Sequence, residues 1–148
     1  MDVVQVKIGK VKRNKMNPSQ SSIYRDLELL MLWYLPVGNK LPKARSVQYL
    51  GDKIQDSISD AMTACAIALN TSDLASRLEL IDMMVWHLTT CKSMFKVLCE
   101  WQSKDRQKVR VITDVECLNF TEMMNSLKRQ LGGWRKKTAE SLNGQVKS

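Results

Sequence analysis

The chain has 148 residues, the size of one domain and enough to bury a core. It carries 23 Lys and Arg against 15 Asp and Glu, a formal net charge of +8, which favours nucleic acid or another acidic partner. Four cysteines without a C-x-x-C pair, one histidine and no apolar run near the roughly 20 residues of a membrane span argue against a zinc site and a membrane protein.

Residues 1–21 form a basic leader. It holds five cations against one acid: Lys7, Lys10, Lys12, Arg13 and Lys15 against Asp2. Two interpretations stay open for this segment. It is either a disordered tail, as exposed termini often are, or an arm that orders on a partner, on phosphates or by adding a strand.

Residues 22–35 predict the first helix, with Ser21 or Ser22 as its candidate N-cap. Tyr24, Leu27, Met31 and Tyr34 recur every three or four residues, and the second half is apolar nearly all round. Such a helix must be buried on more than one side, either at the centre of the domain or against another subunit. Pro36 lacks a backbone N–H, so we expect the helix to end before it.

A tight basic turn follows. Gly38 and Asn39 tolerate left-handed backbone angles, and Pro42 suits the entry to a helix. The turn also gathers three cations, which we expect to be presented to a partner: Lys40, Lys43 and Arg45.

Residues 43–69 predict the second helix, from an apolar stripe at steps of three or four: Val47, Leu50, Ile54, Ile58, Ala61, Cys65 and Leu69. Gly51 inside this helix costs about 1 kcal/mol relative to alanine and indicates close approach of another backbone. The polar residues 70–73 predict a reversal of the chain.

Residues 73–101 predict the third helix. Beyond its core stripe it carries a second apolar set, which is either an adaptable contact surface or a wide core face: Met83, Met84, Trp86, Met94 and Trp101. Lys92 and Lys96 lie one turn apart, and an anionic partner would relieve their repulsion. Residues 103–111 break the periodicity and predict a linker.

Residues 113–137 predict the fourth helix, which Thr113 and Glu116 open with a capping box. Gly132 and Gly133 either end this helix or let a neighbour approach. Its end is strongly positive, as helix C-termini favour, with Lys128, Arg129, Arg135, Lys136 and Lys137. Residues 139–148 complete the chain as a polar tail.

These elements predict an all-α fold, an antiparallel up-down-up-down four-helix bundle over residues 22–138. We find no phosphate-binding loop, Ser-His-Asp pattern or metal constellation, and His87 is better explained by packing than by catalysis. The chain is therefore expected to bind rather than to catalyse, without a cofactor or metal. With no secretory signal in view, we expect it in the cytoplasm.

A set of short motifs adds a family resemblance. Leu-Pro at 35–36, Lys-Leu-Pro-Lys-Ala-Arg at 40–45, Tyr-Leu-Gly at 49–51 and Leu-Gly-Gly-Trp at 131–134 occur in this order within residues 23–137. In order and spacing they resemble the accessory variability determinant (Avd) family of diversity-generating retroelements. That resemblance implies a homopentameric ring of helical bundles, without an active site, that binds a reverse transcriptase and template-repeat RNA, with cDNA as a further ligand, to support mutagenic cDNA synthesis.

The resemblance also implies roles for residues. Binding positions would be Lys43, Arg45, Lys128, Arg129, Arg135, Lys136 and Lys137, to which charge alone adds Lys12, Arg13, Lys15, Lys40, Lys92 and Lys96. Structural positions would be Pro42, Gly51, Gly132, Gly133 and Trp134, with Pro36 as a helix end. The third helix lacks the arginines that family members often carry. Two alternatives remain: the related bundle type encoded in ribosomal RNA intervening sequences, and a basic protein–protein adaptor.

Overall fold

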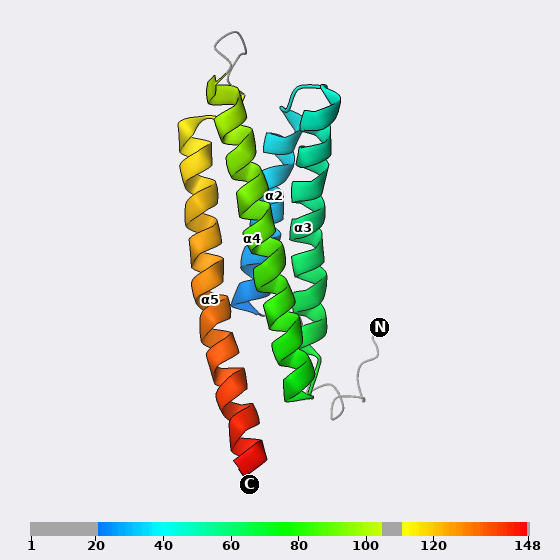
Figure 1. Ribbon diagram of the computed structural model, residues 1–148, viewed down its shortest axis with the longest axis vertical. Helices are drawn as coiled ribbons and strands as arrows, with labels where there is room; N and C mark the ends of the chain where they lie inside the picture. The colour runs from blue at the N-terminus through cyan, green and yellow to red at the C-terminus, as the bar shows by residue number, and fades with distance from the viewer. Residues whose placement is uncertain (1–20, 105–110, 148) are drawn as a thin grey trace, which may run out of the picture.

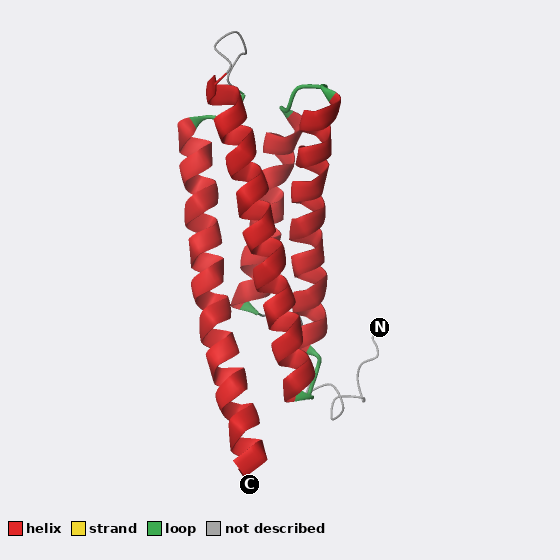
Figure 2. Ribbon diagram, viewed as in Figure 1, coloured by secondary structure: helices red, strands yellow, loops and turns green. Residues whose placement is uncertain are grey.

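The computed structural model describes residues 21–104 and 111–147, which fold into four helices and no strand. The helices are α2 (Ser22–Asn39), α3 (Arg45–Leu69), α4 (Leu74–Lys104) and α5 (Asp114–Lys147). Figures 1 and 2 show them side by side, with successive connections at opposite ends of the bundle. The predicted all-α bundle of four helices is thus confirmed for the described residues, while residues 1–20 of the leader lie outside them.

Each helix packs on two neighbours. α3 contacts α2 and α4, and α5 contacts α4 and α2, so α2 and α4 lie on a diagonal. Three aromatic rings fill the space between α2, α4 and α5. Phe95 and Phe120 stack with their centroids 4.0 Å apart, and Trp33 lies 6.1 and 5.8 Å from them. This cluster fixes the packing beneath the face that α4 and α5 share.

The N-terminus of α2 is capped as predicted. Ser21 Oγ accepts the backbone N–H of Tyr24 at 3.3 Å. The predicted end before Pro36 is wrong, because α2 continues to Asn39 with Pro36 inside it. Pro36 leaves the Leu32 carbonyl without its helical donor, but Leu32 is 62% exposed, so water can replace that donor, and buried Val37 holds the last turn on the core.

Gly51 lies where α3 meets the end of α2. The Tyr34 hydroxyl donates a hydrogen bond to the Gly51 carbonyl at 2.9 Å. A Cβ at Gly51 would lie 2.7 Å from Cδ1 of Leu41, closer than real Cβ atoms approach. The close neighbour at Gly51 is thus the end of a leucine side chain, which could shift to admit a Cβ, rather than the second backbone that we expected.

The α2–α3 connection, residues 40–44, is shorter than the predicted 36–42, because α2 extends to Asn39, although α3 begins at Arg45 and not at Lys43. Gln48 explains the late start. Its Nε2 donates to the carbonyls of Leu41 at 3.4 Å and Pro42 at 2.9 Å, so these groups are satisfied outside the helix. Pro42 therefore belongs to the connection and precedes the helix by more than one residue.

The reversal predicted at residues 70–73 joins α3 to α4. Asp73 Oδ2 accepts the backbone N–H of Ser76 at 2.9 Å and its hydroxyl at 2.6 Å, which lowers the pKa of Asp73. α4 then runs past its predicted end at Trp101 to Lys104. The predicted linker starts correspondingly later, and its residues 105–110 lie outside the described part.

Buried Gln102 holds the chain where it returns to the bundle. Its Oε1 accepts the backbone N–H groups of Val111 at 3.2 Å and Ile112 at 3.1 Å, and its Nε2 donates to the Ile112 carbonyl. The predicted capping box then opens α5. Thr113 Oγ1 accepts the N–H of Glu116 at 3.0 Å, and Glu116 Oε1 accepts the N–H of Thr113 at 2.9 Å.

The predicted end of the fourth helix at Lys137 is wrong, because α5 continues to Lys147 and most of the predicted tail is helical. Gly132 and Gly133 do not end the helix. A Cβ at either would meet nothing within 4 Å, so within this chain they admit no close neighbour either. Buried Leu131 and Thr138 hold the helix on both sides of the pair, which outweighs a cost of about 1 kcal/mol per glycine.

Candidate nucleic-acid interface

Four of the predicted cations gather where α4 and α5 meet the solvent. Lys92 Nζ donates to Asn125 Oδ1 across the two helices at 3.2 Å. Lys96 lies one turn from Lys92 on α4, and Lys128 and Arg129 lie one turn from Asn125 on α5. We call Lys92, Lys96, Lys128 and Arg129 the basic seam. It brings together charges from two predicted helices that sequence alone could not place side by side.

A pocket of about 140 Å³ opens between the helices at the basic seam. Its lining combines two lysines with apolar and weakly polar groups: Lys92, Phe95, Lys96, Cys99, Cys117, Phe120 and Thr121. Phe95 and Phe120 are the stacked pair of the core, and with 2% and 1% of their surface exposed they close the pocket from below without offering a ring face. The ammonium groups at its rim suit an anionic ligand.

The cations of the basic seam are only weakly neutralised. Lys96 lies 3.9 Å from Glu100, and both side chains are more than half exposed. Such a pair contributes about 0–1 kcal/mol and is screened by salt. Within the described residues, Lys92, Lys128 and Arg129 form no ion pair. Phosphate oxygens could therefore approach the basic seam without first displacing a strong partner.

Arg135, which we predicted as a binding residue, has a different environment. Its Nε donates to Asp82 Oδ1 at 2.7 Å, which ties α5 to α4. The hydrogen bond from Arg135 to Asp82, together with the charge of that carboxylate, raises the pKa of Arg135. The structure thus places Arg135 in an ion pair, whereas Lys136 and Lys137 beside it are exposed.

Lys40 is a second predicted binding residue that is engaged within the fold. Its Nζ lies 2.8 Å from both carboxylate oxygens of Glu116, so it ties the α2–α3 connection to α5. Partial burial alone would raise the pKa of Glu116, but hydrogen bonds from Lys40 and Thr113 and the charge of Lys40 together lower it. Lys40 therefore acts first as a link between elements.

The remaining predicted residues lie apart from the basic seam. Lys43 and Arg45 are exposed at the α2–α3 connection, where Arg45, Ser46 and Tyr49 line an open hollow of about 450 Å³. Lys12, Arg13 and Lys15 lie outside the described residues. Of the predicted structural residues, Trp134 packs against the core, whereas Gly132 and Gly133 are exposed. The predicted binding surface is thus split between separate places.

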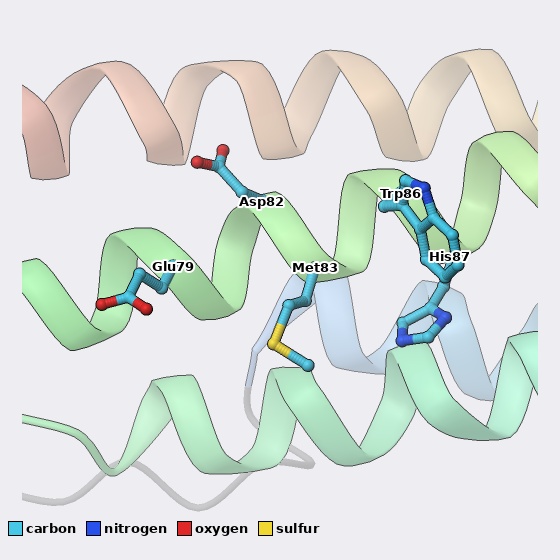
Figure 3. A pocket seen from close by; sticks show the side chains of 5 residues that line it. All are labelled: Glu79, Asp82, Met83, Trp86 and His87. Carbon is cyan, nitrogen blue, oxygen red and sulfur yellow. The ribbon is translucent and has the colours of Figure 1, made fainter.

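A second surface, on the side of α4 away from the basic seam, was only partly visible in the sequence. Glu79, Asp82, Met83, Trp86 and His87 line an open pocket of about 420 Å³, which we call the Trp86 patch (Figure 3). Trp86 is 66% exposed, although Met84 of the same predicted apolar set is buried. Sequence could assign these residues to one helix but could not separate the core side of that helix from the solvent side.

Two further observations describe what the fold contains. Within residues 21–104 and 111–147, no three His, Cys, Asp or Glu side chains come together as metal ligands would. None of the helices in the described part is long and apolar enough to cross a membrane.

Comparison with known proteins gives no family assignment: no protein-family model, no curated protein and no solved structure matches the chain.

Proposed function

We propose that the chain is a non-catalytic accessory protein of a diversity-generating retroelement. In this role it binds the reverse transcriptase and the template RNA, and supports mutagenic cDNA synthesis in the cytoplasm. The observation that carries the proposal is the basic seam, in which Lys92 and Lys96 of α4 line a pocket and Lys92 contacts Asn125 of α5, one turn from Lys128 and Arg129. The motif resemblance at residues 35–51 and 131–134 supplies the biological context.

The chemistry of the basic seam suits RNA held without strict sequence choice. Lysine contacts to phosphates supply affinity and position but read no base. An accessory protein that must hold many template sequences needs contacts of this kind.

The proposal includes assembly of antiparallel up-down-up-down bundles into a homopentameric ring. Support comes from α2, which packs on α3 and α5 and leaves Leu29, Leu32 and Leu35 exposed. On α5, Val115 and Leu118 are exposed as well. Exposed apolar residues in such number favour contact with another protein surface, and a second copy or the polymerase would cover them.

RNA binding is tested with two charge-matched double variants. Lys92→Gln/Lys128→Gln removes two cations of the basic seam, and Arg25→Gln/Lys53→Gln removes two exposed cations from α2 and α3. We expect the seam variant to bind single-stranded RNA on the order of tenfold more weakly at 50 mM salt. The slope of log affinity against log salt should flatten by about 1.4, roughly 0.7 per lost phosphate contact.

Fluorescence anisotropy of a labelled RNA between 50 and 200 mM salt measures both quantities. Equal losses in the two variants would mean that net charge matters and the basic seam does not. Co-purification with the reverse transcriptase, with and without RNase, and mass photometry test the rest. We expect a complex containing about five copies of the 17.0 kDa chain, and RNA binding without polymerase binding would contradict the retroelement role.

A further inference from the structure

The Trp86 patch combines large apolar side chains with acidic side chains on an exposed surface. Figure 3 shows the Trp86 ring turned outward, Met83 and His87 directed toward α3, and Asp82 directed toward α5. The Trp86 and His87 rings meet edge to face with their centroids 5.3 Å apart. A large aromatic side chain and a methionine exposed side by side are costly to leave in water, and they pack well against aliphatic chain.

The surroundings of the Trp86 patch are acidic. Glu79 is exposed within it, and Asp52, Asp56 and Asp60 follow one another at one-turn spacing on the exposed face of α3. The Cys91 thiol lies 3.9 Å from the Ile54 carbonyl, and α4 runs back along α3 (Figure 1), so Asp60 is the member of this row that lies at the level of the patch.

The cations near the Trp86 patch are occupied elsewhere. Arg77 donates to the Thr71 carbonyl at the α3–α4 turn at 2.6 Å, and the Lys53 ammonium lies 5.5 Å from the centroid of the Tyr49 ring. Arg135 pairs with Asp82 at the edge of the patch and neutralises that acid, which leaves Glu79 and the row on α3 to attract a cation. The patch therefore favours an occupant that is basic and partly apolar.

The chain itself contains such an occupant. The basic leader carries Lys7, Lys10, Lys12, Arg13 and Lys15 against Asp2, and these cations alternate with Val6, Ile8 and Val11. Its aliphatic residues match Met83 and Trp86, and its lysines match Glu79 and the aspartate row. No other stretch of the sequence combines five cations and one acid with this many aliphatic residues within 15 positions.

The leader is long enough to reach. The Ser22 hydroxyl lies 3.2 Å from Gln130 on α5, and Arg135, five residues along the same helix, pairs with Asp82 of the patch. The start of α2 and the patch are therefore about 7.5 Å apart along the bundle axis. Neighbouring axes lie 8–10 Å apart, so the path around the bundle is of the order of 30 Å. Residues 1–20 span up to about 66 Å when extended.

We propose that the basic leader binds the Trp86 patch of its own chain. A tethered segment acts at an effective concentration in the millimolar range, so weak contacts suffice to keep it bound. The proposal does not rest on RNA binding by the basic seam. It does imply that Lys12, Arg13 and Lys15 cannot contact phosphates while the leader is bound, so RNA would compete with the patch for them.

Zero-length crosslinking of the full chain tests this contact. A carbodiimide activates a carboxyl group, a lysine amine attacks its carbon to form an amide, and the carboxyl oxygen leaves in the urea product. We expect mass spectrometry to find amides between leader lysines and Glu79, Asp56 or Asp60. An equal mixture of ¹⁴N- and ¹⁵N-labelled protein separates links within one chain from links between chains.

Two matched variants control for charge and exposure. Trp86→Ala/Glu79→Gln should reduce the leader links to the aspartates at least fivefold. Leu118→Ala/Glu122→Gln, an exposed leucine and an exposed acid one turn apart on α5, should leave them unchanged. Trp86 and Glu79 are exposed, so the patch variant should keep its circular dichroism spectrum.

A second readout uses the indole of Trp86. The difference in acrylamide quenching between the native chain and Trp86→Phe isolates this residue, and neutralising the five leader cations to Gln should increase its quenching about twofold. Three results would each overturn the proposal. They are the absence of crosslinks between the leader and the patch, crosslinks found only between ¹⁴N and ¹⁵N chains, and Trp86 quenching that stays unchanged when the leader cations are neutralised.

Discussion

The two exposed edges of α4 carry opposite charge. They also differ in burial, because buried aromatic rings lie beneath one edge, whereas the aromatic ring of the other edge is exposed. Along α5, Lys92 and Lys96 lie over stacked Phe95 and Phe120, and Lys128 and Arg129 lie one turn from Asn125, which Lys92 contacts. Along α3, Glu79 and Met83 surround Trp86, whose ring lies in solvent. Because a helix turns 100° per residue, one sequence can thus offer separate surfaces to an anionic and to a cationic partner. The net charge of +8 conceals this division.

The largest predicted effect concerns what lies under each edge. Phe120→Ala removes a fully buried ring beneath the basic seam and should lower the free energy of unfolding by about 3–5 kcal/mol. Trp86→Ala removes an equally large side chain from the other edge, and should change that free energy by no more than about 0.5 kcal/mol, since the ring is mostly exposed.

Guanidinium unfolding of both variants at one protein concentration measures the difference. A large loss from Trp86→Ala would mean that another surface covers Trp86 and contributes to stability. In that case the contact of the leader, or of a second chain, with the Trp86 patch would be part of the stable fold.

The next largest effect concerns thiol reactivity, which should differ between the cysteines at the basic seam and those between α3 and α4. Cys99 and Cys117 are partly exposed at the pocket of the basic seam, while Cys65 and Cys91 are buried between α3 and α4. Burial raises the pKa of Cys65 and of Cys91 to about 12, from an ordinary value of 9.0. The thiolate is the reactive form, so at pH 8 the buried thiols hold on the order of a thousandfold less of it.

We expect Ellman's reagent to modify two thiols rapidly in the native chain, and two more at least a hundredfold slower. Cys99→Ser/Cys117→Ser should abolish the rapid phase. Cys65→Ser/Cys91→Ser should leave it intact. Four thiols reacting together would show that the bundle opens as one unit on the time scale of the reaction.

Features that depend on a few neighbouring residues could be predicted from the sequence. The caps at Ser21 and Thr113 follow from hydrogen bonds within three residues, and both are confirmed. The helix ends at Pro36 and Lys137 were predicted wrongly, because burial of Val37 and Thr138 outweighs local breakers. Propensity describes one residue at a time, whereas packing decides how far a helix extends.

The candidate site could be predicted in composition but not in arrangement. Lys40 and Glu116 are 76 positions apart, and Asp82 and Arg135 are 53 apart, so sequence gave no reason to pair them. These two ion pairs link elements of the bundle. Lys40 and Arg135 are therefore neutralised within the fold, whereas the cations of the basic seam are only weakly neutralised. A basic residue that is predicted from charge alone is therefore open to a partner only if the fold leaves it without an acidic neighbour.

The smallest predicted effect tests that distinction at Lys40. In the folded chain the pKa of Glu116 is lowered, so its ion pair with Lys40 adds stability that is fully present above the ordinary value of 4.5 and is lost as the pH falls through the lowered value. Lys40→Met should therefore cost about 0.2–1 kcal/mol at pH 7, discounted for partial exposure, and progressively less below pH 4.5. Lys128→Met should show no such trend, because the Lys128 ammonium forms no ion pair within the described residues.

RNA affinity should respond in the opposite order, falling for Lys128→Met and staying level for Lys40→Met. Chemical unfolding from pH 3 to 7 measures the stability, and fluorescence anisotropy at pH 7 measures the RNA affinity. A loss of RNA affinity in Lys40→Met would mean that Lys40 belongs to the binding surface after all.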